Sequence, residues 1–235
     1  ARLIAVSESL ARHMRAAGFR ADRITVVPNG VPVQPARPGV GRSTGEWTLG
    51  TVALFRPRKG LEVLLEALPR ILKVFPEAMV EFAGPYKRIL GEETYFDRLS
   101  PVIDGFIRRG AWPFTGELNP GEMAAFYPNL DMLVLPSLNS TEAFGLVQIE
   151  AMMNGVPCVA SNLPGVRQPV IRHGMGKVIP IGDAEALAES VIEILRNPDG
   201  FKSEPETIAA VYRPEAVAAD YEVLFEELLR ELHPE

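Results

Sequence analysis

The sequence predicts an α/β fold in which a parallel, doubly wound sheet is covered by helices on both faces. Beyond Trp47, short apolar segments alternate with longer segments that favour helices, and this alternation is typical of sheets built from βαβ units. The 235 residues are 47% hydrophobic and 23% charged. That apolar content is sufficient for a packed core and excludes a disordered chain.

The elements of this sheet are expected in a regular order along the chain. Short, apolar runs rich in β-branched residues predict five strands, at 48–54, 78–82, 111–114, 132–135 and 156–160. The segments between and after them predict five helices, at 60–75, 94–109, 120–127, 144–153 and 183–196. Residues 47–200 are therefore expected to form one domain, and its ligand site is expected beyond the carboxyl ends of the strands.

Residues 1–30 predict a separate unit. The apolar run 3–6 and the run 24–27 are expected to be strands, and Ser7 is expected to cap a helix that Gly18 ends. Because the chain opens inside a strand, we interpret this unit as the end of a preceding, incomplete domain. A short edge strand exposed by removal of an initiator Met is the alternative.

Two further segments flank the predicted sheet domain. Residues 31–46 are rich in proline and glycine and predict a linker. Residues 200–212 are polar and irregular, with room for a short helix, and Pro214 stands where a proline opens a helix, here to about residue 232. The apolar residues of that helix recur at helical spacing, so this C-terminal tail (201–235) needs a surface to pack against.

Composition excludes several classes of function. The net charge of −6 and the pI near 5.3 argue against a nucleic-acid-binding protein. The single cysteine, Cys158, excludes an internal disulfide framework, and the three histidines lie far apart with no metal-ligand spacing. No apolar run reaches the roughly 18 residues of a membrane span, so a cytosolic protein is expected.

The first loop that could carry chemistry follows the strand 48–54. It places three cations, Arg56, Arg58 and Lys59, directly before the helix that begins at Gly60. Free backbone N–H groups and the helix dipole favour an anion at such a position, and arginine and lysine both bind phosphate. This pattern predicts a site for a phosphate-bearing ligand, and a solvated basic loop is the alternative.

The second loop follows the strand 132–135 and contains two carboxylates eight residues apart, Glu142 and Glu150. If both were helical, they would lie about 12 Å apart along the axis. That length would let one carboxylate bind sugar hydroxyls and the other ribose hydroxyls of a nucleotide diphosphate sugar. The alternative is a Glu142 that only complements the helix dipole and a solvent-facing Glu150.

Two more loops could contact a ligand. Gly165, after Pro164, suits a turn that approaches a ligand closely, although a plain Pro-Gly turn is equally consistent. The loop that contains Gly84 and Tyr86 could place Tyr86 against a nucleobase, with simple packing as the alternative. Cys158, inside an apolar strand, is expected to be core packing.

Taken in order, these loops resemble the C-terminal half of a family 4 retaining glycosyltransferase, an enzyme of the GT-B fold. Each matching segment is weak alone, but the ordered set spans about residues 3–196. The matching segments are 24–31, 59–60, 84–85, 114–116, 135–137, 142–157, Gly165 and 182–188.

The resemblance implies specific roles for several residues. Glu142 matches the glutamate beside the donor sugar, where we expect it to position the sugar and to support its oxocarbenium-like state. Glu150 matches the glutamate that binds ribose, and Lys59 matches the lysine on the diphosphate. Backbone N–H groups at 143–146 are expected to contact the sugar and phosphates, the residues being Ala143, Phe144, Gly145 and Leu146.

Two positions depart from the family pattern. Leu54 stands where members usually have an arginine, and Arg56 or Arg58 is expected to supply that charge. Gln168 stands where an acidic residue is usual, which weakens the expectation that the Gly165 loop contacts the donor sugar.

The resemblance implies a hexosyltransferase that transfers a sugar from a UDP-, GDP- or ADP-sugar to a sugar or lipid-linked acceptor with retention. No Asp-x-Asp motif is present, so neither a metal nor another cofactor is expected.

The N-terminal domain would hold the acceptor, the final helix would pack back on that domain, and the isolated chain would be inactive. The complete protein would be cytoplasmic, at most peripheral on the inner membrane face. A non-catalytic nucleotide-sugar-binding module and, less favoured, a GT-B nucleotide-sugar epimerase are the alternatives.

Overall fold

The computed structural model describes residues 2–33, 46–139 and 144–232. Its main feature is a six-stranded sheet with the order β5-β4-β3-β6-β7-β8, in which all paired strands are parallel. The chain builds outward from β3 to one edge and then from β6 to the other, which is the Rossmann strand order. The predicted fold class is confirmed. The strands are β3 (Trp47–Val52), β4 (Ala78–Ala83), β5 (Phe114–Gly116), β6 (Met132–Leu135), β7 (Cys158–Ser161) and β8 (Gly176–Ile179).

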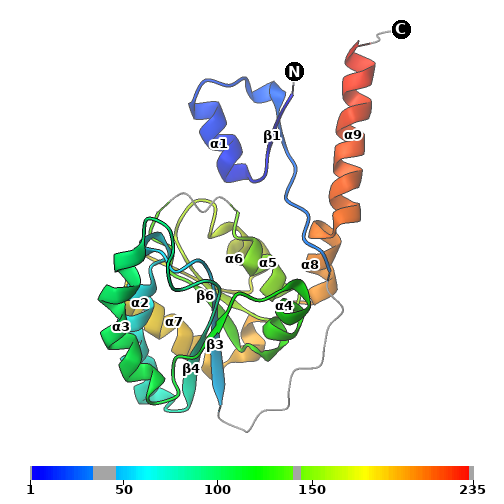
Figure 1. Ribbon diagram of the computed structural model, residues 1–235. Coiled ribbons are helices and arrows are strands. Elements are labelled where there is room, and N and C mark those ends of the chain that lie inside the picture. The colour runs from blue at the N-terminus through cyan, green and yellow to red at the C-terminus, as the bar shows by residue number, and fades with distance from the viewer. Residues whose placement is uncertain (1, 34–45, 140–143, 233–235) are drawn as a thin grey trace.

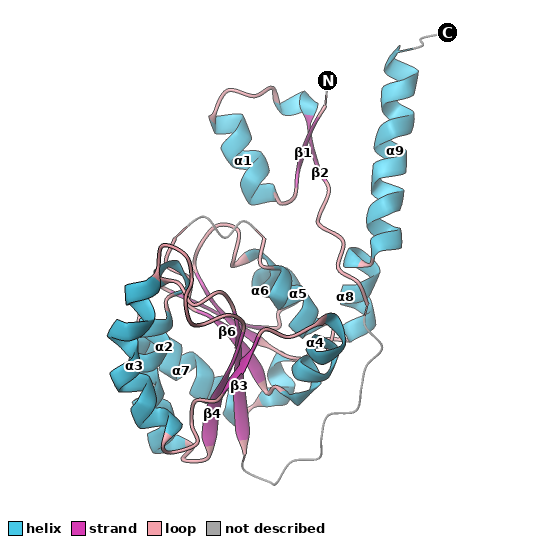
Figure 2. Cartoon of the chain, viewed as in Figure 1, coloured by secondary structure: helices cyan, strands magenta, loops and turns pink. Residues whose placement is uncertain are grey.

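Helices cover both faces of this sheet (Figures 1 and 2). Side chains alternate along β6, so that Met132 and Val134 join one core and Leu133 and Leu135 join the other. The first face is covered by α2 (Leu61–Val74), α3 (Glu93–Ile107) and α7 (Ala184–Arg196). The second is covered by α4 (Pro120–Phe126), α5 (Leu146–Met152), α6 (Gln168–His173) and α8 (Pro205–Tyr212).

Single turns of 3-10 helix complete the connections. They are η1 (Ala21–Arg23), η2 (Pro57–Lys59), η3 (Tyr127–Asn129) and η4 (Pro198–Phe201). The turn η2 follows the carboxyl end of β3 and precedes α2, whereas η3 precedes the amino end of β6.

The structure corrects several predicted boundaries. The strand expected at 111–114 begins only at Phe114: Ala111 and Pro113 accept bonds from β4, but Pro113 has no N–H to donate. The sixth strand, β8, and the helix α6 were not predicted, whereas α8 is the short helix for which residues 200–212 left room. The helix expected at 144–153 begins at Leu146, after a left-handed Gly145.

A small unit precedes the sheet domain. Strands β1 (Leu3–Ala5) and β2 (Ile24–Val26) pair in parallel, and α1 (Glu8–Ala16) connects them. As expected, Ser7 caps the helix by accepting a bond from the Leu10 N–H. Ala5, Ala11 and Ile24 form the buried centre of this unit.

The last helix, α9 (Pro214–Leu232), runs beside the small unit (Figure 1). Glu231 forms ion pairs with Arg2 and, at 3.0 Å, with Arg23. The start of the predicted linker packs against the sheet domain: Val31 is 1% exposed, and its N–H donates to the Tyr212 carbonyl at 2.7 Å. The division into domains at 30, 46 and 200 stays a prediction.

Candidate functional site

The loops after β3 and β6 meet at the centre of the sheet, where the strand order reverses direction. Position 60 requires glycine for two reasons: its backbone is left-handed (φ +67°), and a Cβ there would lie 1.9 Å from the Pro136 carbonyl oxygen. The Leu138 N–H donates to the Arg58 carbonyl at 2.8 Å. The two loops that the sequence singled out independently are thus in direct contact, at the position where doubly wound sheets bind their ligands.

The cations of the first loop lie on this contact. Arg58 and Lys59 lie in η2, the turn that comes just before α2, and Arg56 precedes this turn. All three side chains are half-buried, and within the described residues the buried Arg56 Nε has no hydrogen-bond partner. A guanidinium N–H without a partner and a helix N-terminus together suit an anionic ligand.

The second loop is described only in part, because Glu142 and Ala143 lie outside the described residues. Gly145 is left-handed (φ +75°), and a Cβ there would lie 2.3 Å from Gln148 Nε2. The helix therefore starts at Leu146, and the separation estimated for a helix spanning both glutamates does not apply. Gln148 itself is fully buried and donates to the Val166 carbonyl at 2.8 Å, which ties α5 to the Gly165 turn.

Phe144 faces the small unit. Its ring meets the ring of Tyr212 edge-on, with 6.0 Å between centroids. It also lines a cavity of about 290 Å³, together with residues of the small unit, α6 and α9 that include Glu8, Arg172 and Asp220. The loop that carries Phe144 is thus placed between the sheet domain and the small unit.

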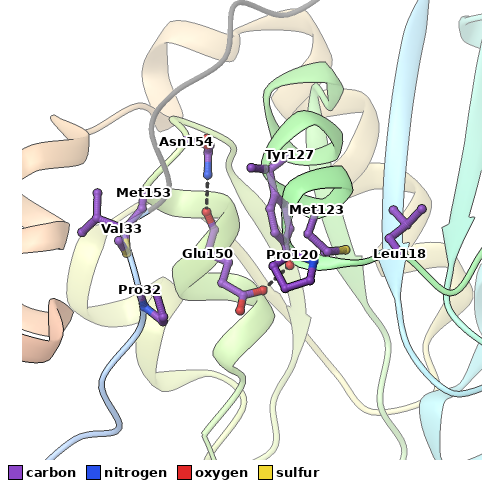
Figure 3. Close-up of a pocket in the computed structure, with 10 residues that line it drawn as sticks. Pro32, Val33, Leu118, Pro120, Met123, Tyr127, Glu150, Met153 and Asn154 are labelled. Atoms are coloured by element: carbon purple, nitrogen blue, oxygen red, sulfur yellow. Dashed lines mark hydrogen bonds between the residues drawn. The ribbon is translucent and has the colours of Figure 1, made fainter.

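Glu150 lines a cavity on the second face of the sheet (Figure 3). Its carboxylate accepts a hydrogen bond from the Tyr127 hydroxyl. Burial and the Glu150 charge raise the pKa of Tyr127, so this hydroxyl stays protonated and acts as the donor. The cavity has a volume of about 300 Å³, and its lining residues are Pro32, Val33, Leu118, Pro120, Met123, Ala124, Tyr127, Glu150, Met153 and Asn154.

A third cavity, of about 280 Å³, adjoins the Glu150 cavity and shares Leu118 and Met123 with it. It lies at the carboxyl ends of β3 and β4 and is lined by Leu54 and Gly84, among others. Gly84 has φ +134°, and a Cβ there would lie 2.1 Å from the Ala53 carbonyl oxygen. Leu54, at the position where the family has arginine, gives this cavity an apolar wall.

The remaining predicted residues are placed as follows. The ring of Tyr86 stacks on Phe114, with centroids 4.0 Å apart, which supports the packing alternative. Gly165 is buried in the turn between β7 and α6, and Gln168 donates to the Pro164 carbonyl at 3.0 Å. Cys158 is fully buried, which confirms that it belongs to the core, and burial raises the pKa of its thiol.

Sequence reasoning missed several residues around Glu150. Tyr127 is 23 residues away in the chain, and no local pattern connects the two. Asn154 was accessible to prediction, because it lies four residues after Glu150, and its side chain donates to the Glu150 carbonyl at 2.8 Å. The described residues include no cluster of three or more metal-binding side chains and no helix suited to cross a bilayer.

Comparison with protein families gives a match over residues 34–210 to the family described as "Glycosyl transferases group 1". This segment covers most of the chain and contains both central loops and Glu150, whereas Pro32 and Val33, which also line the Glu150 cavity, lie just before it. The chain belongs to this family. The resemblance to family 4 glycosyltransferases of the GT-B fold is thereby confirmed.

Curated members of the family include two informative relatives. The phosphatidyl-myo-inositol mannosyltransferase of Mycobacterium leprae is 34% identical over 200 residues, which cover 83% of this chain and 50% of the relative. A glycogen synthase of Mycobacterium tuberculosis is 33% identical over 180 residues, which cover 74% of this chain and 40% of that protein. The chain spans about half the length of the curated relatives it matches.

Solved glycosyltransferase structures share the fold. A glycosyltransferase from Rickettsia africae superposes with a TM-score of 0.82 at 19% identity, covering 97% of this chain and 64% of the other. Anabaena Alr3699/HepE, solved in complex with UDP, gives a TM-score of 0.81 at 19% identity, covering 96% and 64%. These similarities confirm the Rossmann-like fold.

Proposed function

We propose that this chain is the donor-binding part of a retaining glycosyltransferase that takes a hexose from a nucleotide diphosphate sugar. One observation carries the proposal: the Lys59 loop and the Pro136–Leu138 loop are in contact at the centre of the sheet, and the Glu150 cavity adjoins the same edge. A nucleoside in the two adjoining cavities would place its diphosphate toward Lys59. The Phe144 loop would then hold the sugar.

In this proposal the protein stabilises the leaving group through its own cations. Cleavage of the donor builds negative charge on the nucleoside diphosphate. We infer that Arg56, Arg58 and Lys59, which precede the N-terminus of α2, stabilise that charge, and that the reaction uses no metal ion or other cofactor. Glu142 is assigned to positioning the sugar and to electrostatic support of its oxocarbenium-like state.

The remaining parts of the function are proposed from the relatives. UDP in the Anabaena complex and the mannosyltransferase and glycogen synthase relatives support a nucleotide-sugar donor and a sugar or lipid-linked acceptor. We assign the acceptor to an N-terminal domain of the same protein, with α9 packing on it. The protein would work in the cytoplasm, at most bound peripherally to the membrane.

Calorimetric titration of the 235-residue chain with UDP, GDP and ADP tests donor binding. We expect one of them to bind, and we expect Lys59→Ala to weaken that diphosphate about tenfold or more, because a charged contact contributes about 1.5–3 kcal/mol. The affinity for the corresponding nucleoside monophosphate should fall less in Lys59→Ala. Lys73→Ala is the matched control, since Lys73 is exposed in the last turn of α2, at the end of that helix far from the Lys59 loop. Absence of binding by all three nucleotides would refute the proposal.

Transfer is tested in the complete enzyme. Glu142→Gln should abolish sugar transfer while nucleotide binding persists, and unchanged turnover would refute the role of Glu142. Binding without transfer in the complete wild-type protein would favour the non-catalytic module. Exchange of sugar epimers without an acceptor would favour the epimerase.

A further inference from the structure

The hydrogen bond between Tyr127 and Glu150 joins two elements that are distant in sequence. Tyr127 belongs to η3, before β6, and Glu150 belongs to α5, after it. Tyr127 is 3% exposed, and its ring packs edge-on against Phe126, with centroids 5.7 Å apart. The phenol hydroxyl is therefore held by the core and fixes the carboxylate that accepts its hydrogen bond.

The carboxylate keeps an oxygen that Tyr127 does not use. The tyrosine bonds to Oε2 of Glu150, while Asn154 bonds to the Glu150 backbone carbonyl and leaves the side chain untouched. Figure 3 shows the carboxylate pointing toward Tyr127 and Pro120, away from Asn154. Glu150 is half-buried, and Leu118 and Met123 line the same cavity. The anchored carboxylate is thus a charged acceptor in largely apolar surroundings.

A carboxylate accepts hydrogen bonds and donates none, so it suits neighbouring hydroxyl groups such as those at positions 2′ and 3′ of ribose. The contribution of such a carboxylate to ligand affinity depends on whether the side chain is already oriented. A long, free side chain loses rotamer freedom when a ligand binds, and that loss lowers the affinity. We propose that Tyr127 is a positioning residue: it holds the Glu150 carboxylate toward the ribose hydroxyls of a nucleoside diphosphate and so sets a preference for ribonucleotides over deoxyribonucleotides. This inference rests on the proposed function.

The chain contains a matched pair for comparison. The Tyr95 hydroxyl donates to the Glu62 carboxylate, and Tyr95 is also buried, at 4% exposure. This pair joins α3 to α2 on the first face of the sheet, outside the cavities that contain Glu150 and Gly84. Loss of the Tyr95 hydroxyl therefore reproduces the structural effect of losing a buried tyrosine-carboxylate bond without touching the nucleoside cavity.

The test is a double-mutant cycle between the protein and the ligand. The tightest binder among UDP, GDP and ADP is titrated against wild type and Tyr127→Phe, together with its 2′,3′-dideoxy analogue. We expect Tyr127→Phe to weaken the ribonucleotide about three- to tenfold, as loss of one hydrogen bond predicts. The affinity for the dideoxy analogue should change less than twofold, because this analogue has no ribose hydroxyl for the carboxylate to bind. Tyr95→Phe should change neither.

Urea unfolding of both phenylalanine variants checks that each is folded under the conditions of the titration. Equal weakening of the ribonucleotide and its dideoxy analogue, or no weakening of either, would overturn the positioning role. A Glu150→Ala variant sharpens the test: Tyr127→Phe made in that background should no longer affect ribonucleotide affinity. A wild-type chain that binds none of the three nucleotides would instead overturn the proposed function, and this inference with it.

Discussion

The two faces of the sheet differ in how they are filled. The first face, under α2, α3 and α7, is packed with apolar side chains, including a group of touching rings: Phe55, Phe82, Tyr95, Phe96 and Phe114. The second face, under α4, α5, α6 and α8, contains the Glu150 cavity and the fully buried, polar Gln148. The strands supply both faces, because alternate residues point to opposite sides of the sheet, but Gln148 and Glu150 come from the covering helix α5.

This difference separates the source of stability from the candidate ligand site. A well-packed apolar face contributes to the free energy of folding through burial, whereas a face with cavities and buried polar groups gives up packing for binding. The two faces of the sheet meet where the Lys59 loop contacts the Pro136–Leu138 loop. Substitutions should therefore affect mainly stability on the first face, and mainly binding or loop position on the second.

The largest effect is expected in the core of the first face. Ile71, in α2, is fully buried, so Ile71→Ala should lower the free energy of unfolding by about 2–5 kcal/mol. Nucleotide affinity of the folded fraction should stay unchanged. Urea unfolding measures the first quantity and calorimetry the second. Leu90→Ala is the control, since Leu90 is 88% exposed and should cost less than about 0.5 kcal/mol.

A somewhat smaller effect is expected where the faces meet. Gly60→Ala must adopt a left-handed backbone and displace the Pro136 carbonyl, so it should cost about 2–4 kcal/mol in unfolding free energy and weaken nucleotide binding. Gly91→Ala has similar backbone strain (φ +79°) but no atom within 4 Å of its Cβ. If the two variants were equally stable, the contact between the loops would not be tight.

The next effect concerns the second face. Gln148→Leu removes a buried hydrogen bond and leaves the Val166 carbonyl without its donor, so it should lower the unfolding free energy by about 1–2 kcal/mol. Gln168→Leu removes a similar bond, to the Pro164 carbonyl, at a half-buried position and should cost less. A stabilising Gln148→Leu would show that the polar contact is not needed to hold the Gly165 turn.

The smallest effect is a dependence on pH at His173. Burial and the neighbouring Arg172 lower the pKa of His173, which also contacts the Tyr212 hydroxyl at 3.2 Å. The unfolded chain therefore binds a proton more readily, and His173 should contribute less stability as the pH falls through about 6.5. Urea midpoints measured between pH 5 and 8 should fall less steeply at low pH for His173→Asn than for wild type. Identical slopes would contradict the assignment.

The order of strands and helices was largely accessible from the sequence, because apolar periodicity and turn residues are local signals. The misses have different causes, one local and one not. Pro113 delays β5, and β8 begins at Gly176, where a Cβ would lie 1.8 Å from the Cys158 carbonyl oxygen. The sequence offers no sign of that close approach, since it depends on which strand lies alongside.

Local sequence patterns were sufficient to predict the fold class, the family and the edge of the sheet where a ligand is expected, because the carboxyl ends of parallel strands lie on one edge of a sheet. The hydrogen bond from Tyr127 to Glu150, the packing of Tyr86 on Phe114 and the hydrogen bond from Val31 to Tyr212 depend on the three-dimensional arrangement of the chain. Such contacts join residues that no short-range pattern links. They form because close packing leaves each buried polar group few partners within reach.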